Sequence, residues 1–321
     1  MKKPFLIVIM VIGITLDAGS VGAAEGGTSF YLLGQRGQGA AVLPPVEGVF
    51  FSMPTYRYSG DASATGSLPI GGSAALGIDA DVTLLMPTIL WVTPAKVLRG
   101  DLALSGTFVY GNADLNADLT IVIPPIQGSV ALQDDRWTTG DPVLGALVGW
   151  HGESHHYLVS ASVNVPAGDY EAGRLSNVAM NRWAGDITVA GTWMFPEKNI
   201  ELSGAAGITF NGENDDTDYK TGTEFHLEAS AFYQFTPTFS AGMNGYYYEQ
   251  LTGDSGSGAT LDDFKGQVAG IGPGVSGAFQ VGQVPVSVSL RYFHEFNAKN
   301  RLEGDAGFLT VSIPLWVPGA S

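Results

Sequence analysis

The sequence predicts an all-β protein, an antiparallel β-barrel that crosses the bacterial outer membrane. Three observations predict it: long segments with strict two-residue alternation, connections that alternate between short and long, and an N-terminal signal with no second apolar span behind it. A tilted membrane strand needs about 9–11 residues, whereas soluble strands average about 5–6 residues. The length of the alternating segments is therefore the discriminating observation.

The composition agrees with this class. Charged residues make up 14% of the chain, whereas ordinary domains have about 25%. Glycine supplies 44 of 321 residues, roughly double its usual share of about 7%. The 15 Lys and Arg residues are outnumbered by 31 Asp and Glu residues, for a net charge of -16. This balance argues against nucleic acid as a partner. The absence of cysteine excludes disulfides and thiol catalysis, and with no cofactor motif in the sequence we expect no cofactor.

The first 24 residues resemble a cleaved secretory signal. Lys2 and Lys3 precede a 13-residue apolar stretch, and small residues follow up to Ala24. A membrane-spanning helix needs about 20 apolar residues, so the shorter stretch favours a signal peptide. The predicted organisation is a signal peptide at 1–24, an N-terminal plug or periplasmic segment at 25–45, a transmembrane barrel at 46–316 and a C-terminal tail at 317–321.

Residues 25–45 do not alternate. Several glycines and the Pro44-Pro45 pair make this stretch unsuited to strand pairing. A barrel lumen is one place where irregular backbone is protected from lipid. We expect a short plug there, with a periplasmic tail as the alternative.

The clearest alternation lies in residues 185–195, 199–211 and 223–235. In the last of these, apolar and polar side chains take turns without a break, and the apolar set should face lipid while the polar set faces the lumen. The apolar set is Phe225, Leu227, Ala229 and Ala231, and the polar set is Glu224, His226, Glu228 and Ser230. Aromatic residues near strand ends are expected to form an interface belt: Trp193, Phe195, Tyr233, Phe235, Tyr246 to Tyr248, Tyr292 and Phe296.

Twelve strands can be counted, and an even number places both chain termini of the barrel in the periplasm. Residues 116–136 could add two more strands, but Pro124-Pro125 cannot sit inside a central strand. We prefer a β-hairpin within an extracellular loop at 113–140, with fourteen strands as the alternative. The predicted strands are 46–58, 74–94, 100–112, 141–150, 155–165, 184–195, 199–211, 222–235, 238–251, 266–281, 285–297 and 305–316.

Few residues suggest chemistry. The string WHGESHHY could place His151 and His155 opposite each other across a turn, but no further ligands complete a metal site, and polar turn residues are the preferred interpretation. Four acidic residues in NGENDDTDY, namely Glu213, Asp215, Asp216 and Asp218, suit a solvated loop bridged to lipopolysaccharide better than a calcium site. No G-x-S-x-G string is present, and Ser154 beside His155 is not triad geometry. We expect no enzyme and no catalytic residue.

The lumen is the better candidate for function. The alternation turns seven ionisable side chains inward as candidate lumen-lining residues: Asp186, Glu201, Glu224, His226, Glu228, Arg291 and Glu295. A polar lumen is expected of any such barrel, so these residues could simply solvate one another. Alternatively, they form a narrow acidic path that disfavours anions.

Several strings resemble the outer-membrane family of the meta-pathway of phenol degradation, in the family's order. These strings are AEGGTSFYLLGQRGQGAAVLPPVEGVFF, GDPVLGALVGWHGESHHY, GRLSNVAMNRWAGD, FNGENDDTDYKTGTEFHLE, YYYEQLTGDSGSGATLDDFKGQVAGIGPG and NRLEGDAGF. The resemblance implies an outer-membrane barrel that helps hydrophobic aromatic compounds to cross, and it assigns no functional residues. Barrels commonly end on an aromatic assembly signal, whereas this chain continues past Trp316. Either Trp316 serves that role or assembly differs.

We therefore expect a channel for passive uptake of small hydrophobic, aromatic compounds linked to aromatic degradation. The alternatives are a general porin for hydrophilic solutes and a structural or adhesive surface barrel with a closed lumen. The expected partners are outer-membrane lipids, lipopolysaccharide, the solutes themselves and the barrel-assembly machinery.

Overall fold

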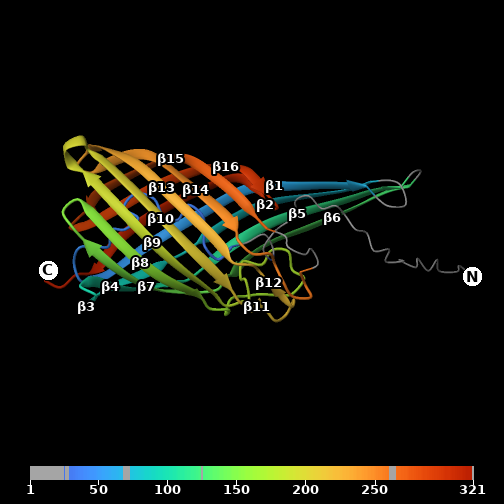
Figure 1. The fold of residues 1–321 in the computed structure, drawn as a ribbon, viewed down its shortest axis with the longest axis horizontal. Helices are drawn as coiled ribbons and strands as arrows, with labels where there is room; N and C mark the ends of the chain where they lie inside the picture. Colours follow the sequence, from blue (N-terminus) through green and yellow to red (C-terminus); the bar gives the residue numbers. More distant parts are fainter. Residues whose placement is uncertain (1–24, 26–28, 68–72, 124–125, 260–264, 320–321) are drawn as a thin grey trace, which may run out of the picture.

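One antiparallel sheet closes on itself to form the body of the protein (Figure 1). The computed structural model describes residues 25, 29–67, 73–123, 126–259 and 265–319. The expected signal peptide at 1–24 lies outside the described residues. Within the described residues, no helix has both the length and the apolar character needed to cross a membrane.

The sheet is closed by pairing of its first and last strands, from Val49 opposite Trp316 to Asp61 opposite Glu303. Its strands are β1 (Gly48–Ser67), β2 (Ser73–Leu85), β3 (Thr88–Val97), β4 (Gly100–Thr107), β5 (Tyr110–Ile123), β6 (Ile126–Thr139), β7 (Val143–His151), β8 (His155–Asn164), β9 (Ala184–Phe195), β10 (Ile200–Asn211), β13 (Glu224–Thr236), β14 (Phe239–Gln250), β15 (Gln267–Val281), β16 (Val284–Lys299) and β17 (Glu303–Trp316). The short strands β11 (Glu213–Asn214) and β12 (Tyr219–Lys220) form a separate hairpin, and η2 (Pro196–Lys198) is a single 3-10 turn.

The barrel wall has twelve strands because three of them are interrupted. The segments β2 and β3, β4 and β5, and β6 and β7 each follow one line, with β1 pairing β3 near its start and β2 beyond. Pro54 and Pro87 lie where β1 changes partner, and proline cannot donate a ladder hydrogen bond. The count of twelve is confirmed, fourteen is wrong, and the strand expected at 74–94 is broken at Met86-Pro87.

Part of the sheet continues beyond the closed barrel. The far ends of β1 and β2, together with β5 and β6, form a four-stranded extension that projects to the right in Figure 1. The hairpin expected within a loop at 113–140 exists as β5 and β6. It is not part of a loop, however, because its strands continue the wall strands β4 and β7.

Short turns gather at the other end of the barrel. Connections of two to four residues join β3 to β4, β7 to β8, β9 to β10, β13 to β14 and β15 to β16. Asn199 and Gly282 adopt positive φ angles of 54° and 63° in two of these turns, and asparagine and glycine tolerate that conformation best. Long connections follow β8, β10 and β14, and their described residues 165–183, 212–223, 251–259 and 265–266 lie at the end that carries the extension (Figure 1).

The two faces of the wall follow the predicted alternation. Along β13, Glu224, His226, Glu228 and Ser230 are buried inside the barrel, whereas Leu227, Ala229 and Ala231 are exposed on its outer surface. Most of the expected belt residues are exposed. Tyr246 and Tyr248 are not, because they share the inner face of β14 and are buried; of this trio only Tyr247 points outward.

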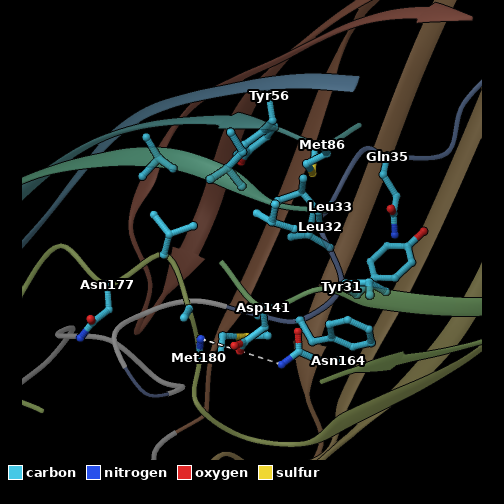
Figure 2. Close-up of a pocket in the computed structure, with 18 of the residues that line it drawn as sticks. Tyr31, Leu32, Leu33, Gln35, Tyr56, Met86, Asp141, Asn164, Asn177 and Met180 are labelled. Carbon is cyan, nitrogen blue, oxygen red and sulfur yellow. Dashed lines mark hydrogen bonds between the residues drawn. The ribbon is translucent and has the colours of Figure 1, made fainter. Parts of the chain in front are cut away.

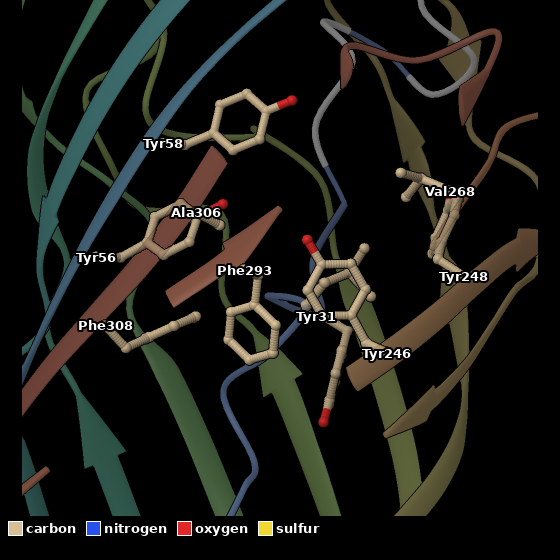
Figure 3. Packing of buried hydrophobic residues seen from close by; sticks show 10 residues of the cluster. Tyr31, Tyr56, Tyr58, Tyr246, Tyr248, Val268, Phe293, Ala306 and Phe308 are labelled. Atoms are coloured by element: carbon tan, nitrogen blue, oxygen red, sulfur yellow. The ribbon is translucent and has the colours of Figure 1, made fainter. Parts of the chain in front are cut away.

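An aromatic cluster inside the barrel takes up those two tyrosines (Figure 3). It joins rings from β1, β14, β16 and β17 with Tyr31 of the N-terminal segment, residues 29–43. Its members include Tyr31, Tyr56, Tyr246, Phe293 and Phe308, and adjacent ring centroids lie 4.8–6.5 Å apart. The interior is therefore part aromatic and part charged, rather than uniformly polar as the alternation alone suggested.

Candidate functional site

The N-terminal segment lies inside the barrel, held by side chains of the wall. Glu228 accepts backbone N–H bonds from Gly34 at 3.1 Å and Arg36 at 3.0 Å, and Thr192 accepts one from Ala41 at 3.1 Å. Irregular backbone has no neighbouring strand to satisfy its polar groups, so inward carboxylates and hydroxyls take that part. Whether the segment acts as a plug stays a prediction, because a plug is defined by its effect on permeation.

Three more of the seven predicted lumen residues contact this segment. Glu201 accepts hydrogen bonds from the backbone of Gly39 at 2.5 Å and the side chain of Gln38 at 3.1 Å. Arg291 donates to the carbonyl of Gln35 at 2.9 Å. Glu224 accepts from the Ser29 hydroxyl at 2.7 Å and from Tyr248 at 2.6 Å.

Asp186 and His226 form a buried pair. Nε2 of His226 lies 2.8 Å from Oδ2 of Asp186, whose oxygens also accept from Thr188 and Thr209. The ring of Tyr31 stacks on the imidazole, with centroids 3.3 Å apart and planes 13° apart. These contacts engage both carboxylate oxygens and hold the imidazole in place, which favours a structural role in seating the N-terminal segment over an open polar path.

The seventh residue, Glu295, belongs to the aromatic cluster. Its carboxylate accepts from Tyr58 at 2.9 Å and Tyr246 at 2.8 Å. Arg301 lies over the Tyr248 ring at 4.3 Å, a cation–π contact that brings a positive charge to the same end of the lumen. The structure thus distributes the seven residues along one side of the interior, and their part in permeation stays a prediction.

A cavity of about 750 Å³ lies in the interior beside these residues, and Asp186 and Glu295 contribute to its wall (Figure 2). The rest of the wall comes from the inner faces of β1, β2, β4, β5, β7 and β8, from the N-terminal segment and from the connection that follows β8. Apolar side chains predominate on and beside β2, β5 and β7: Ala80, Val82, Leu84, Met86, Val109, Ala113, Leu115, Val143 and Leu147. The strands β4 and β8 add the hydroxyls of Ser105, Thr107, Ser160 and Ser162. A cavity of this size and character suits a small hydrophobic molecule.

Asp141 fixes the connection that covers this cavity. Its two oxygens accept backbone N–H bonds from Ala167, Gly168, Met180 and Asn181 and a side-chain bond from Asn164, all between 2.9 and 3.1 Å. Figure 2 shows Asp141 between Met180 and Asn164 at the rim. One buried carboxylate therefore folds both ends of residues 165–183 toward the lumen.

The other sequence candidates lie at the two barrel ends. His151 faces His156 across the β7–β8 turn, with Nδ1 atoms 2.9 Å apart, so the expected partner His155 was wrong. Asp216 accepts a hydrogen bond from Asn181, and Asp218 from the backbone of Ser257, which ties the acidic string to neighbouring loops. In the same loops, burial and the Asp254 carboxylate raise the pKa of the Tyr219 phenol well above its usual range.

Sequence reasoning missed the cavity and its anchor. Leu84, Leu115 and Met86 carry no chemical signature, and only their parity relative to Asp79, Asp81 and Asp114 could have revealed an apolar inner face. Asp141 stands in the string GDPV, where an aspartate before proline suggests a turn but not a carboxylate that gathers a distant loop.

Fold, interior cavity and loop arrangement together define the class of protein: a channel-like β-barrel of the outer membrane, with its apolar outer wall in contact with lipid. A family model described as "Putative MetA-pathway of phenol degradation" matches residues 62–311, and the chain belongs to that family. Among proteins of curated function, none matches the chain by sequence.

A solved outer-membrane channel has a similar fold. The COG4313 outer membrane channel from Pseudomonas putida F1 is 13% identical with a TM-score of 0.61, covering 86% of this chain and 98% of that one. A FadL homologue from Pseudomonas aeruginosa is 9% identical with a TM-score of 0.40, covering 92% and 99%. OccAB4 from Acinetobacter baumannii is 9% identical with a TM-score of 0.31, covering 84% and 98%.

Proposed function

We propose that this protein is a channel, not an enzyme, and that it admits small hydrophobic, aromatic compounds passively through the outer membrane. The observation that carries the proposal is the cavity of about 750 Å³, whose wall on β2, β5 and β7 is apolar although the lumen of such a barrel is ordinarily polar. Burial of apolar surface is the main favourable term for such a solute, and the rings of Tyr31 and Tyr56 add flat contact area.

The N-terminal segment supports a narrow rather than a wide path. Residues 29–43 occupy the charged side of the lumen, so hydrophilic solutes would have to displace backbone that Glu201 and Glu228 hold. We infer that the segment is a plug that leaves the apolar side as the route. Passive transport agrees with a sequence that has no nucleotide-binding motif.

The test is transport by the purified protein in liposomes and planar bilayers. We expect uptake of naphthalene above that of empty liposomes, little uptake of sucrose and only a small conductance. Deleting residues 25–45 should raise the conductance. A large steady conductance in the intact protein would instead indicate a general porin, and no passage of either solute would indicate a structural barrel.

Matched variants locate the route. Leu84→Arg places a charge in the cavity wall, whereas Thr83→Arg places it on the outer face one residue away. Naphthalene uptake should fall with Leu84→Arg and stay unchanged with Thr83→Arg, provided that both migrate as folded barrels on detergent gels. Equal uptake by both variants would contradict a route through this cavity.

Two further partners follow from the surface. The acidic loop residues Glu213 and Asp215 suit bridging to lipopolysaccharide through divalent cations, and exposed Trp316 suits recognition by the barrel-assembly machinery. Chelation of divalent cations should then weaken the contact between these loops and lipopolysaccharide. Trp316→Ala should slow assembly without altering the stability of the folded barrel.

A further inference from the structure

The inner face of the extension is an apolar strip made by three neighbouring strands. Leu76 on β2 lies opposite Leu119 on β5, which lies opposite Val130 on β6. Ile78, Ala117 and Leu132 form the next row in the same way. Directly opposed residues share a face of the sheet, so six apolar side chains lie side by side.

This strip continues into the cavity. Side chains two residues apart share a face, so Ile78 is followed on β2 by Ala80, Val82 and Leu84, and Leu119 is followed on β5 by Leu115 and Ala113. All five of the residues that follow line the cavity. On β6 the same face carries the polar residues Asp134 and Arg136 at the end nearer the barrel, opposite Leu115 and Ala113. There Asp134 accepts a hydrogen bond from the backbone N–H of Ser176.

The strip meets water rather than lipid. Val130 and Leu132 are 59% and 55% exposed. The opposite face of the same strands carries Asp79, Asp81, Asp114, Asp118 and Asp135, which no lipid-embedded surface would bear. Contiguous apolar surface that stays exposed to water often marks an interaction site or a ligand-binding groove.

The dimensions select the occupant. The two rows that span three strands, about 4.8 Å apart, cover roughly 10 by 7 Å, and β2 and β5 alone continue the strip to a total length of about 27 Å. Its area, on the order of 200 Å², is well below the roughly 800 Å² per partner of a stable protein interface. It accommodates one or a few small aromatic molecules.

We propose that the inner face of the extension is a capture surface on which a neutral, apolar aromatic solute adsorbs from the external medium before it enters the cavity. The inference rests on the proposed function, since it supplies the entry to the same route. It adds a binding site outside the barrel that selects apolar molecules over polar ones. The five aspartates on the opposite face keep the extension hydrated.

Binding at the surface can be measured without transport. The chain has no cysteine, so Leu132→Cys and Gln133→Cys each give one labelling site, on the inner and outer face of β6. Each variant carries an environment-sensitive fluorophore and is titrated with naphthalene. The label at 132 should respond saturably and the label at 133 should not; the same response at both sites, or none at 132, overturns the capture surface.

A second pair of variants tests its use. With Leu132→Asp, naphthalene uptake into liposomes should fall by about threefold or more at low external concentration, because a charge breaks the apolar strip, and should approach the unmodified protein at high concentration. Gln133→Asp is the matched control and should leave uptake unchanged. Because Leu132 is exposed, both variants should retain the gel shift of a folded barrel.

The outcomes separate the two proposals. If the unmodified protein moves no naphthalene, the proposed function fails, while the fluorescence titration still decides whether the surface binds. If the unmodified protein transports naphthalene and Leu132→Asp matches it at every concentration, the capture surface is overturned and the channel stands.

Discussion

In the wall around β13 and in the extension around β5, apolar and polar residues alternate with the same period of two. The sign of the alternation is opposite: apolar residues face outward on β13 and inward on β5. Ala229 points out and Ser230 points in on β13, whereas Asn116 points out and Leu115 points into the interior on β5. The change can be followed along β4 and β5, whose outer face passes from Leu104, Phe108 and Tyr110 to aspartate and asparagine. The solvent outside the sheet, lipid or water, therefore decides which parity is apolar.

The sign change locates the outer edge of the membrane. Tyr110 and Trp137 lie on the outer face at the level where it occurs, with ring centroids 5.3 Å apart. Tyrosine and tryptophan prefer membrane–water interfaces. The barrel wall below this level is built for lipid, and the extension above it is a water-exposed sheet.

The largest expected effect comes from one substitution made on both outer faces. Ala229→Arg puts a charge against lipid near the middle of β13 and should lower the free energy of unfolding by roughly 2–4 kcal/mol. Asn116→Arg puts the same side chain against water and should change it by no more than about 0.5 kcal/mol. Denaturant titrations in lipid vesicles measure both. Similar losses at the two sites would place the extension in the membrane and break the comparison.

The next effect concerns the junction between the two regions. Asp141→Asn keeps the size of the side chain but turns an amide N–H₂ toward N–H donors that the carboxylate now accepts. Hydrogen bonds to charged groups contribute about 1.5–3 kcal/mol each, so the free energy of unfolding should fall by at least that much. The exposed Asp118, which lies opposite Gly77 and Ala131 and faces no other charge, supplies the control, Asp118→Asn. Freed from Asp141, residues 165–183 should also become protease-sensitive, and unchanged proteolysis would contradict the anchoring role.

Much of the wall could be predicted because one strand's pattern is local. The faces of β13 follow from Glu224 to Ala231 alone, and the strand count follows from repeating that reasoning. The extension is harder to predict, because its period of two is the same as that of the wall and only the parity of its polar residues separates the two. Tyr246 and Tyr248 were misplaced for a related reason: aromatic residues near a strand end suit both a belt and a core, and only parity separates the two.

The interior could not be predicted from the sequence. The contacts of Glu228 with Gly34 and of Thr192 with Ala41 join residues more than a hundred positions apart. Nothing in either stretch specifies the other, because a carboxylate can accept from any backbone N–H that packing brings near it. The cavity likewise depends on where the N-terminal segment and residues 165–183 come to rest.

A smaller effect is expected at the level where the sign changes. Tyr110 and Trp137 contact each other as tilted rings, and such pairs contribute about 0.5–1.5 kcal/mol beyond their buried area. A double-mutant cycle with Tyr110→Ala and Trp137→Ala should give a coupling free energy in that range. Unfolding is monitored by circular dichroism, because one variant removes a tryptophan that fluorescence would report. Strictly additive losses would show that the two rings act separately.

The smallest effect concerns charge on the outer face of the extension. Asp81, Asp114 and Asp135 lie directly opposite one another on three neighbouring strands, and one oxygen of Asp114 lacks a hydrogen-bond partner within the described residues. Like charges opposed across strands destabilise a sheet by about 0.2–1 kcal/mol. Asp114→Asn should therefore raise the free energy of unfolding by that amount at pH 7.

The matched control is Asp118→Asn, since Asp118 lies opposite Gly77 and Ala131 and opposes no charge. It should change the free energy of unfolding little. The gain from Asp114→Asn should also shrink at 1 M salt, where the Debye length falls to about 3 Å. Such a gain is possible only if this face is in water: within lipid, removing any carboxylate would help, and Asp118→Asn would stabilise as much as Asp114→Asn. Equal gains from the two variants would thus contradict the sign change itself.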